Sequence, residues 1–201
     1  DVSLTLWDRI GIIDRELSLY QKLSERGVNV TILTFGCEDD LEYRKRYPFL
    51  KIVPIYQGAA KPNTRFGRLI FSLTIPFRHP KLFSSTTIFK TNQIYGGWVF
   101  FVGRFLYNRP ILVRCGYEFV SAARDTGAGP VRLAIMRLYC RLMYRIAARI
   151  IVSTRRMSTV IQSEYSVDPE KISVIGNGLD LKQFAPNRTT KSDRVLFVGR
   201  L

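Results

Sequence analysis

The sequence is poor in the residues on which most catalytic and metal sites are built. It has one histidine, His79, which is followed by proline, and three cysteines, Cys37, Cys115 and Cys140, that lie far apart. This spacing matches neither a zinc site nor a disulfide framework, so a reducing compartment is expected. A Gly-x-Ser-x-Gly elbow, a Walker loop and a dinucleotide-binding glycine pattern are all missing. Nucleophilic catalysis therefore finds little support. His79 is interpreted as a surface or packing residue. Cys115 is either a thiol whose pKa is lowered by Arg114 or a small buried residue at a tight turn.

Acidic residues are also scarce. Against 31 lysines and arginines there are 16 acidic residues, which gives a formal net charge of +15. A charge of this size indicates an anionic partner: nucleic acid, an anionic membrane surface or a phosphorylated substrate. No apolar run reaches the roughly 18 residues of a membrane span. The chain is 46% apolar, which is enough for a sizeable core.

Helix-like and strand-like segments alternate along the chain. Such alternation predicts an α/β fold with a Rossmann-like, doubly wound parallel sheet. The helices are expected at residues 14–26, 94–107, 130–148 and 155–165, and the strands at 28–33, 52–55, 87–90, 111–113, 150–153 and 172–175. Residues 1–11 are expected to form the loop after a first strand that lies upstream. Residues 121–129, which are polar and rich in glycine, are expected to form a mobile loop.

Two stretches are basic and carry no acidic residue. Residues 63–83 interleave nine large apolar side chains with Arg65, Arg68, Arg78 and Lys81. This composition is typical of a segment that lies on an anionic membrane, and equally of a core helix with a basic rim. In the second stretch, residues 130–149, arginines recur every fourth residue at 137, 141, 145 and 149. We interpret that stripe as a solvated face, with membrane contact as the alternative.

The last thirty residues carry a more specific pattern. A strand is followed by Gly176-Asn177-Gly178, then by a hydrophobic residue, Asp180, Phe184 and Pro186. A polar linker at 187–194 leads to a new strand that closes with "VLFVGRL" at 195–201. "VIGNGLDLKQFAP", the spacer and "VLFVGRL" resemble the domain crossing of the retaining GT-B glycosyltransferases, the large group 1 type of family four. The helix, glycine and strand of "RELSLYQKLSERGVNVTILTFG" are similar to the start of many acceptor domains of that fold.

This resemblance implies a domain organisation and a reaction. Residues 1–186 would form the acceptor-binding domain, 187–194 a linker, and 195–201 the first strand of a truncated donor-binding domain. The enzyme would transfer a sugar, with retention, from a nucleotide-sugar to a glycan or a polyprenyl- or lipid-linked acceptor in surface polysaccharide or glycolipid assembly. No metal or other cofactor is expected, and the fragment alone is expected to be inactive. The resemblance places the protein in the cytoplasm, at the inner face of the membrane.

The resemblance also suggests site residues. Arg200 matches the family's diphosphate-binding arginine, and Gly11 is a weaker match to its amino-terminal glycine loop. Many members carry a histidine where this chain has Cys115, which leaves the catalytic residues unassigned. The candidates for acceptor contact lie where strands end and are Asn92, Gln93, Arg114 and Tyr117.

Two other interpretations fit the sequence. One is a non-catalytic half of a split transferase, and the other is a basic nucleic-acid-binding α/β protein. No RNA- or DNA-binding module pattern is present, so nucleic acid is not expected as a partner.

Overall fold

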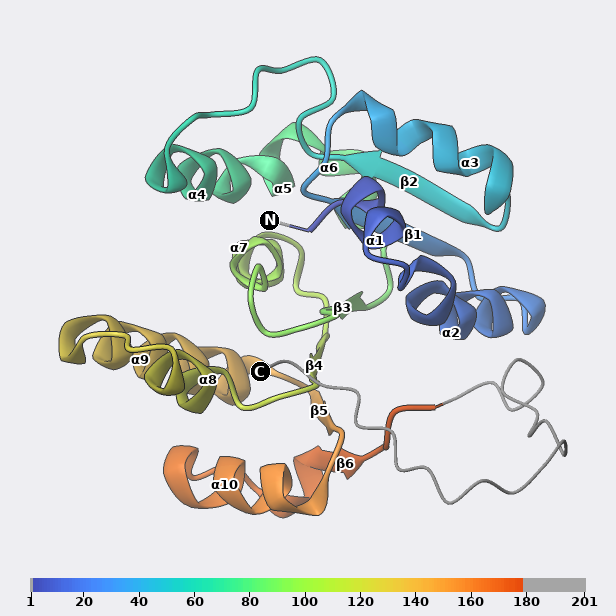
Figure 1. Cartoon of the computed structure of the whole chain (residues 1–201). Coiled ribbons are helices and arrows are strands. Elements are labelled where there is room, and N and C mark those ends of the chain that lie inside the picture. The colour runs from blue at the N-terminus through green and yellow to red at the C-terminus, as the bar shows by residue number, and fades with distance from the viewer. Residues whose placement is uncertain (1, 179–201) are drawn as a thin grey trace, which may run out of the picture.

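The computed structural model describes residues 2–178, within which six strands form two parallel sheets (Figure 1). The smaller sheet pairs β1 (Val30–Thr34) with β2 (Leu50–Pro54). The larger has the order β3-β4-β5-β6, with β3 (Phe89–Lys90), β4 (Ile111–Cys115), β5 (Arg149–Val152) and β6 (Ile172–Val174). All pairs are parallel, as the alternation of helices and strands predicts, and the Rossmann-like α/β fold class is confirmed.

Each connection between consecutive strands of the larger sheet contains one longer helix. These helices are α7 (Trp98–Tyr107), α9 (Pro130–Ile146) and α10 (Arg155–Tyr165). Because the strand order advances in one direction and such crossovers are right-handed, all three cover the same face of the sheet. The main core forms between these helices and the strand residues that point toward them, such as Ile111, Val113 and Ile150.

A second core lies around the smaller sheet. Helices α1 (Leu4–Arg9), α2 (Ile13–Glu25) and α3 (Tyr43–Arg46) and the 3-10 turn η1 (Glu38–Glu42) surround β1 and β2. The prediction of a loop at residues 1–11 is wrong for residues 4–9. The side chain of Ser3 caps α1, and the buried Asp40 carboxylate accepts hydrogen bonds from the backbone N–H and the hydroxyl of Thr5. A cap and a distant anchor stabilise a helix too short to form alone.

The basic stretch at 63–83 folds into three short helices. These are α4 (Arg65–Leu73), α5 (Ile75–Arg78) and α6 (Pro80–Ser85), and prolines at the starts of α5 and α6 break the run. Ile75 and Phe83 are buried in the main core, whereas Phe66, Ile70 and Phe77 are exposed. The stretch therefore divides its apolar side chains between the core and the surface.

The expected mobile loop at 121–129 begins with a helix instead. Helix α8 covers Phe119–Asp125, and the carboxylate of Glu118 accepts hydrogen bonds from the backbone N–H groups of Val120 and Ser121. A glutamate outside the usual set of capping residues makes this helix hard to find from sequence.

The chain reaches β6 through the short turn η2 (Pro169–Lys171). The predicted linker at 187–194 and donor-domain strand at 195–201 lie outside the described residues. Among those that are described, no helix is long and apolar enough to cross a membrane.

Candidate functional site

The carboxyl ends of β3, β4 and β6 are joined by one arginine. The guanidinium of Arg114, in β4, donates to the side-chain oxygen of Asn92 at 3.1 Å and to that of Asn177 at 3.2 Å. Asn92 follows β3, and Asn177 follows β6 in the segment Gly176-Asn177-Gly178. Ligands of parallel α/β sheets bind at this edge. The predicted candidates Asn92 and Arg114 are thus in direct contact.

Helix α2 supplies the acid of the same network. The carboxylate of Glu16 accepts from the amide of Asn92 at 3.1 Å and lies 3.8 Å from the Arg114 guanidinium. The side chains of Glu16 and Arg114 are only 14% and 24% exposed. A largely buried carboxylate needs such partners, because unpaired burial of a charge is costly. The network therefore holds α2 against the ends of β3 and β4.

One helical turn along α2, Tyr20 meets Lys90. The ammonium of Lys90 donates to the Tyr20 hydroxyl at 2.9 Å and lies over the tyrosine ring. Burial lowers the pKa of Lys90 to about 8, with the Arg114 cation lowering it further and the Glu16 carboxylate opposing both. Burial raises the pKa of Tyr20 to about 12. Lys90 is thus a partly desolvated cation next to the network.

Gln93 has a positioning role. Its side-chain oxygen accepts the backbone N–H of Gly116 at 2.8 Å, which ties the loop after β3 to the loop after β4. A Cβ added at Gly116 would lie 2.7 Å from the Gln93 amide nitrogen, so a larger residue there would displace the Gln93 side chain.

Cys115 is a packing residue. Burial raises the pKa of its thiol to about 11, and its sulfur lies 3.5 Å from the Tyr144 hydroxyl. The hypothesis of an activated thiol beside Arg114 is wrong, because desolvation outweighs the attraction of the cation. Burial and the neighbouring Arg78 cation lower the pKa of His79, which lies between α5 and α6.

Tyr117, in the loop after β4, borders a separate hollow. This cavity, of about 310 Å³, opens between α8 and α10 at the carboxyl ends of β4 and β5. Its other polar lining groups are Glu118, Ser121, Asp125, Thr154 and Arg156. The exposed tyrosine ring offers an apolar surface next to hydrogen-bonding groups.

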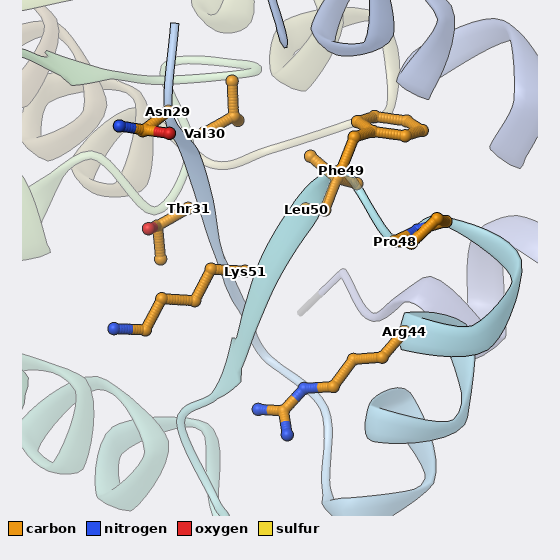
Figure 2. A pocket seen from close by; sticks show the side chains of 8 residues that line it. All are labelled: Asn29, Val30, Thr31, Arg44, Pro48, Phe49, Leu50 and Lys51. Atoms are coloured by element: carbon orange, nitrogen blue, oxygen red, sulfur yellow. The ribbon is translucent and has the colours of Figure 1, made fainter.

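A larger hollow lies at the amino ends of strands, whereas ligands of parallel α/β sheets bind at the carboxyl ends. It measures about 450 Å³ and is lined by residues at the amino ends of β1 and β2 and by Arg44 and Pro48 (Figure 2). The guanidinium of Arg44 is already engaged with the carbonyl of Ile52 at 2.8 Å. We assign no function to this hollow.

The remaining candidates are distributed over the chain. Gly11 joins α1 to α2 with a φ of +71°, a conformation that favours glycine, two residues before the helix that carries Glu16. Arg200 lies outside the described residues. Of the membrane-surface candidates, Arg65, Arg78 and Lys81 are exposed and Arg68 is half-buried. Arg78 lies over the ring of Phe71, with 4.6 Å from the guanidinium carbon to the ring centre. Within residues 2–178 no group of three potential metal ligands gathers.

The comparisons with known proteins agree with this architecture. The model of Glycosyltransferase Family 4 matches residues 17–183, which is most of the chain. This chain belongs to that family. No similar sequence was found among curated proteins.

Solved structures share the fold of this Family 4 chain. HepE from Anabaena, in complex with UDP and glucose, has 14% identity and a TM-score of 0.59, covering 87% of this chain and 44% of its own. The same protein with UDP-glucose gives 14% identity and a TM-score of 0.57, covering 87% of this chain and 43% of its own. A glycosyltransferase from Rickettsia africae ESF-5 has 16% identity and a TM-score of 0.55, over 90% and 43% of the two chains. The chain therefore spans less than half the length of these proteins.

Three residues at this site of the Family 4 chain were not predicted from the sequence: Glu16 and Asn177 of the network, and Lys90 beside it. Glu16 and Tyr20 are four residues apart on one helix. Glu16 gave no signal in the sequence, because acidic residues are common in the first turn of a helix. Lys90 is the last residue of a two-residue strand, and only its pairing beside β4 places it under Arg114. Asn177 was visible as a turn residue, but its contact with Arg114 depends on the sheet order.

Proposed function

We propose that this Family 4 chain binds the acceptor in a glycosyltransferase that transfers a sugar from a nucleotide-sugar with retention of configuration. The observation that carries this proposal is the network of Glu16, Asn92, Arg114 and Asn177 at the carboxyl edge of the sheet. The two half-buried cations Arg114 and Lys90 outnumber the carboxylate of Glu16. Such a balance favours an anionic or strongly hydrogen-bonding ligand.

The residues would divide the work of binding an acceptor. Arg114 and the amides of Asn92 and Asn177 would contact acceptor hydroxyl or phosphate oxygens. Gln93 would act as a positioning residue through Gly116. Tyr117, on the rim of the neighbouring hollow, would stack against a sugar ring.

The donor would be a nucleotide-sugar, and its diphosphate would be stabilised by protein groups without a metal. Support comes from the fold shared with HepE, whose structures hold UDP and UDP-glucose. Arg200 would contact the departing diphosphate, and the backbone near Gly11 would approach it. Arginine and backbone N–H groups stabilise developing negative charge of this kind.

The acceptor would be a glycan or a polyprenyl- or lipid-linked molecule used in surface polysaccharide or glycolipid biosynthesis. A lipid-linked acceptor would be met at the cytoplasmic face of a membrane. Support comes from the exposed Phe66, Ile70 and Phe77 of α4 and α5, which lie among basic residues. Peripheral attachment there would bring acceptor and protein together.

The test is turnover by the full-length protein with a panel of nucleotide-sugars, measured as release of the nucleoside diphosphate. Arg114→Ala should raise the acceptor KM at least tenfold, the scale of about one lost charge-assisted hydrogen bond. The rate at which the Arg114→Ala protein hydrolyses the donor slowly when no acceptor is present should equal that of the wild type. Arg26→Ala, an exposed arginine at the end of α2, is the matched control.

Two results would contradict the proposal. Failure of every nucleotide-sugar to turn over would favour a non-catalytic half of a split transferase. If the Arg114→Ala protein has the wild-type acceptor KM, the network does not bind the acceptor. That result would leave the proposed reaction itself intact.

A further inference from the structure

Helix α9 carries a second apolar stripe, on its outward side. Val131, Ile135, Leu138 and Leu142 are 72%, 64%, 58% and 41% exposed. The inward side of the same helix already buries Cys140, Met143 and Tyr144 in the main core. The outward stripe is therefore not needed to hold α9 to the sheet.

The spacing of these four residues makes one continuous strip. At about 100° per residue, positions 131, 135, 138 and 142 fall within roughly 60° of the helix circumference. At about 1.5 Å per residue the strip is about 17 Å long. Isolated exposed apolar residues are ordinary, but an ordered strip of this length marks an interaction surface.

Arginines border the strip. On the same projection Arg137, Arg141 and Arg145 lie along one side and Arg132 along the other. Within the part of the chain that the structure describes, these four side chains form no ion pair. The sequence has no acidic residue between Asp125 and Glu164. The apolar strip thus lies within a strongly cationic surface.

We propose that this outward face of α9 lies on an anionic membrane surface. A helix with an apolar strip bordered by arginines fits the boundary between headgroups and acyl chains, where the apolar side chains are buried and the guanidinium groups remain among phosphates. A second copy of the chain fits poorly, because it would bring two arginine-rich helices together with no acid between them. Charge complementarity thus favours an anionic lipid surface.

The face is separate from both the acceptor network and the surface at 63–83. The network lies on Arg114 and Glu16, and none of its bonds involves α9. Helix α7 contacts both α4 and α9, and the three lie on the same side of the molecule (Figure 1). Membrane binding through α9 does not require that the protein be a transferase.

The experiment is co-sedimentation of the purified protein with vesicles of phosphatidylglycerol and phosphatidylcholine, and with vesicles of phosphatidylcholine alone. The wild type should bind the anionic vesicles and release them at high salt. Ile135→Gln/Leu138→Gln should weaken that binding about tenfold or more, because two exposed apolar side chains no longer enter the lipid. Arg137→Gln/Arg141→Gln should weaken it chiefly at low salt. The matched control, Leu19→Gln/Ile88→Gln, also replaces two exposed apolar residues and should bind as wild type.

Circular dichroism and thermal melting establish that each variant is folded. The proposal is overturned if wild type does not bind anionic vesicles, or if Ile135→Gln/Leu138→Gln binds them as wild type does. It is also overturned if light scattering at low salt shows a dimer that this variant abolishes, since the strip would then belong to a second copy.

Discussion

Lys90 makes the stability of the protein depend on alkaline pH in a predictable way. Burial lowers its pKa from 10.5 to about 8, so the folded state loses the Lys90 proton at lower pH than the unfolded state. Between these two values the unfolded state binds more protons. Stability from this group therefore rises with pH through the window and falls as pH drops toward 8.

The magnitude follows from the difference between the two pKa values. A shift of about 2.5 pH units corresponds to roughly 3 kcal/mol, most of which, about 2.5 kcal/mol, should appear between pH 7 and pH 10. Other groups also titrate in this range, but they are shared with a Lys90→Met variant. The quantity to compare is thus the free energy of unfolding of wild type minus that of Lys90→Met.

The assay is urea denaturation of both proteins at several pH values, with equal slopes required for comparison. Two further variants should change the pKa of Lys90, and with it the rise in stability between pH 7 and pH 10, in opposite directions. Arg114→Gln removes a cation that lowers the Lys90 pKa and should shrink the rise, whereas Glu16→Gln removes the opposing carboxylate and should enlarge it. A difference between wild type and Lys90→Met that stays flat from pH 7 to pH 10 would refute the buried position of Lys90.

Three other predictions concern the donor site, the membrane and the loop after β4. In the transferase proposed above, Arg200→Ala should lower turnover by about two to three decades, and unchanged kinetics would exclude its contact with the diphosphate. Replacing the four basic residues of the stretch 63–83 by glutamine should reduce binding to anionic vesicles. These residues are Arg65, Arg68, Arg78 and Lys81. Equal partitioning of the wild type and this variant would rule out the stretch as an anchor. Glu118→Ala should lower the free energy of unfolding by about 2 kcal/mol, because it removes the cap of α8 and the acceptor of the Tyr165 hydroxyl. Glu118→Gln keeps an acceptor oxygen and should cost less in urea denaturation; equal losses would mean that the cap is not the cause.

The fold class and the order of its elements could be predicted because hydrophobic periodicity is strong in the central segments. The predicted helix at 130–148 and the observed α9 differ by two residues at one end. Two of the missed helices, α1 and α8, depend instead on single side chains, Ser3 and Asp40 for the first and Glu118 for the second. Local propensity does not reveal such anchors.

The candidate site was predicted only in part for a related reason. Asn92 and Arg114 follow from the rule that ligands bind at the carboxyl ends of strands. Glu16 and Lys90 are bound to them by tertiary contacts that a sequence pattern does not contain. The outward strip of α9 has the same helical period as a core face, so periodicity alone could not tell which apolar side chains are exposed.

The bonds of this network also bear on the order in which the protein folds. Asn92 and Glu16 are 76 residues apart, and Arg114 and Asn177 are 63 apart. Contacts of such long range form late, because the chain between them must first be ordered. The smaller sheet and its helices can condense from neighbouring segments, but Arg114 finds Asn177 only after β6 has docked. A folding intermediate that lacks β6 would thus be compact and rich in secondary structure while the bond between Arg114 and Asn177 is still missing.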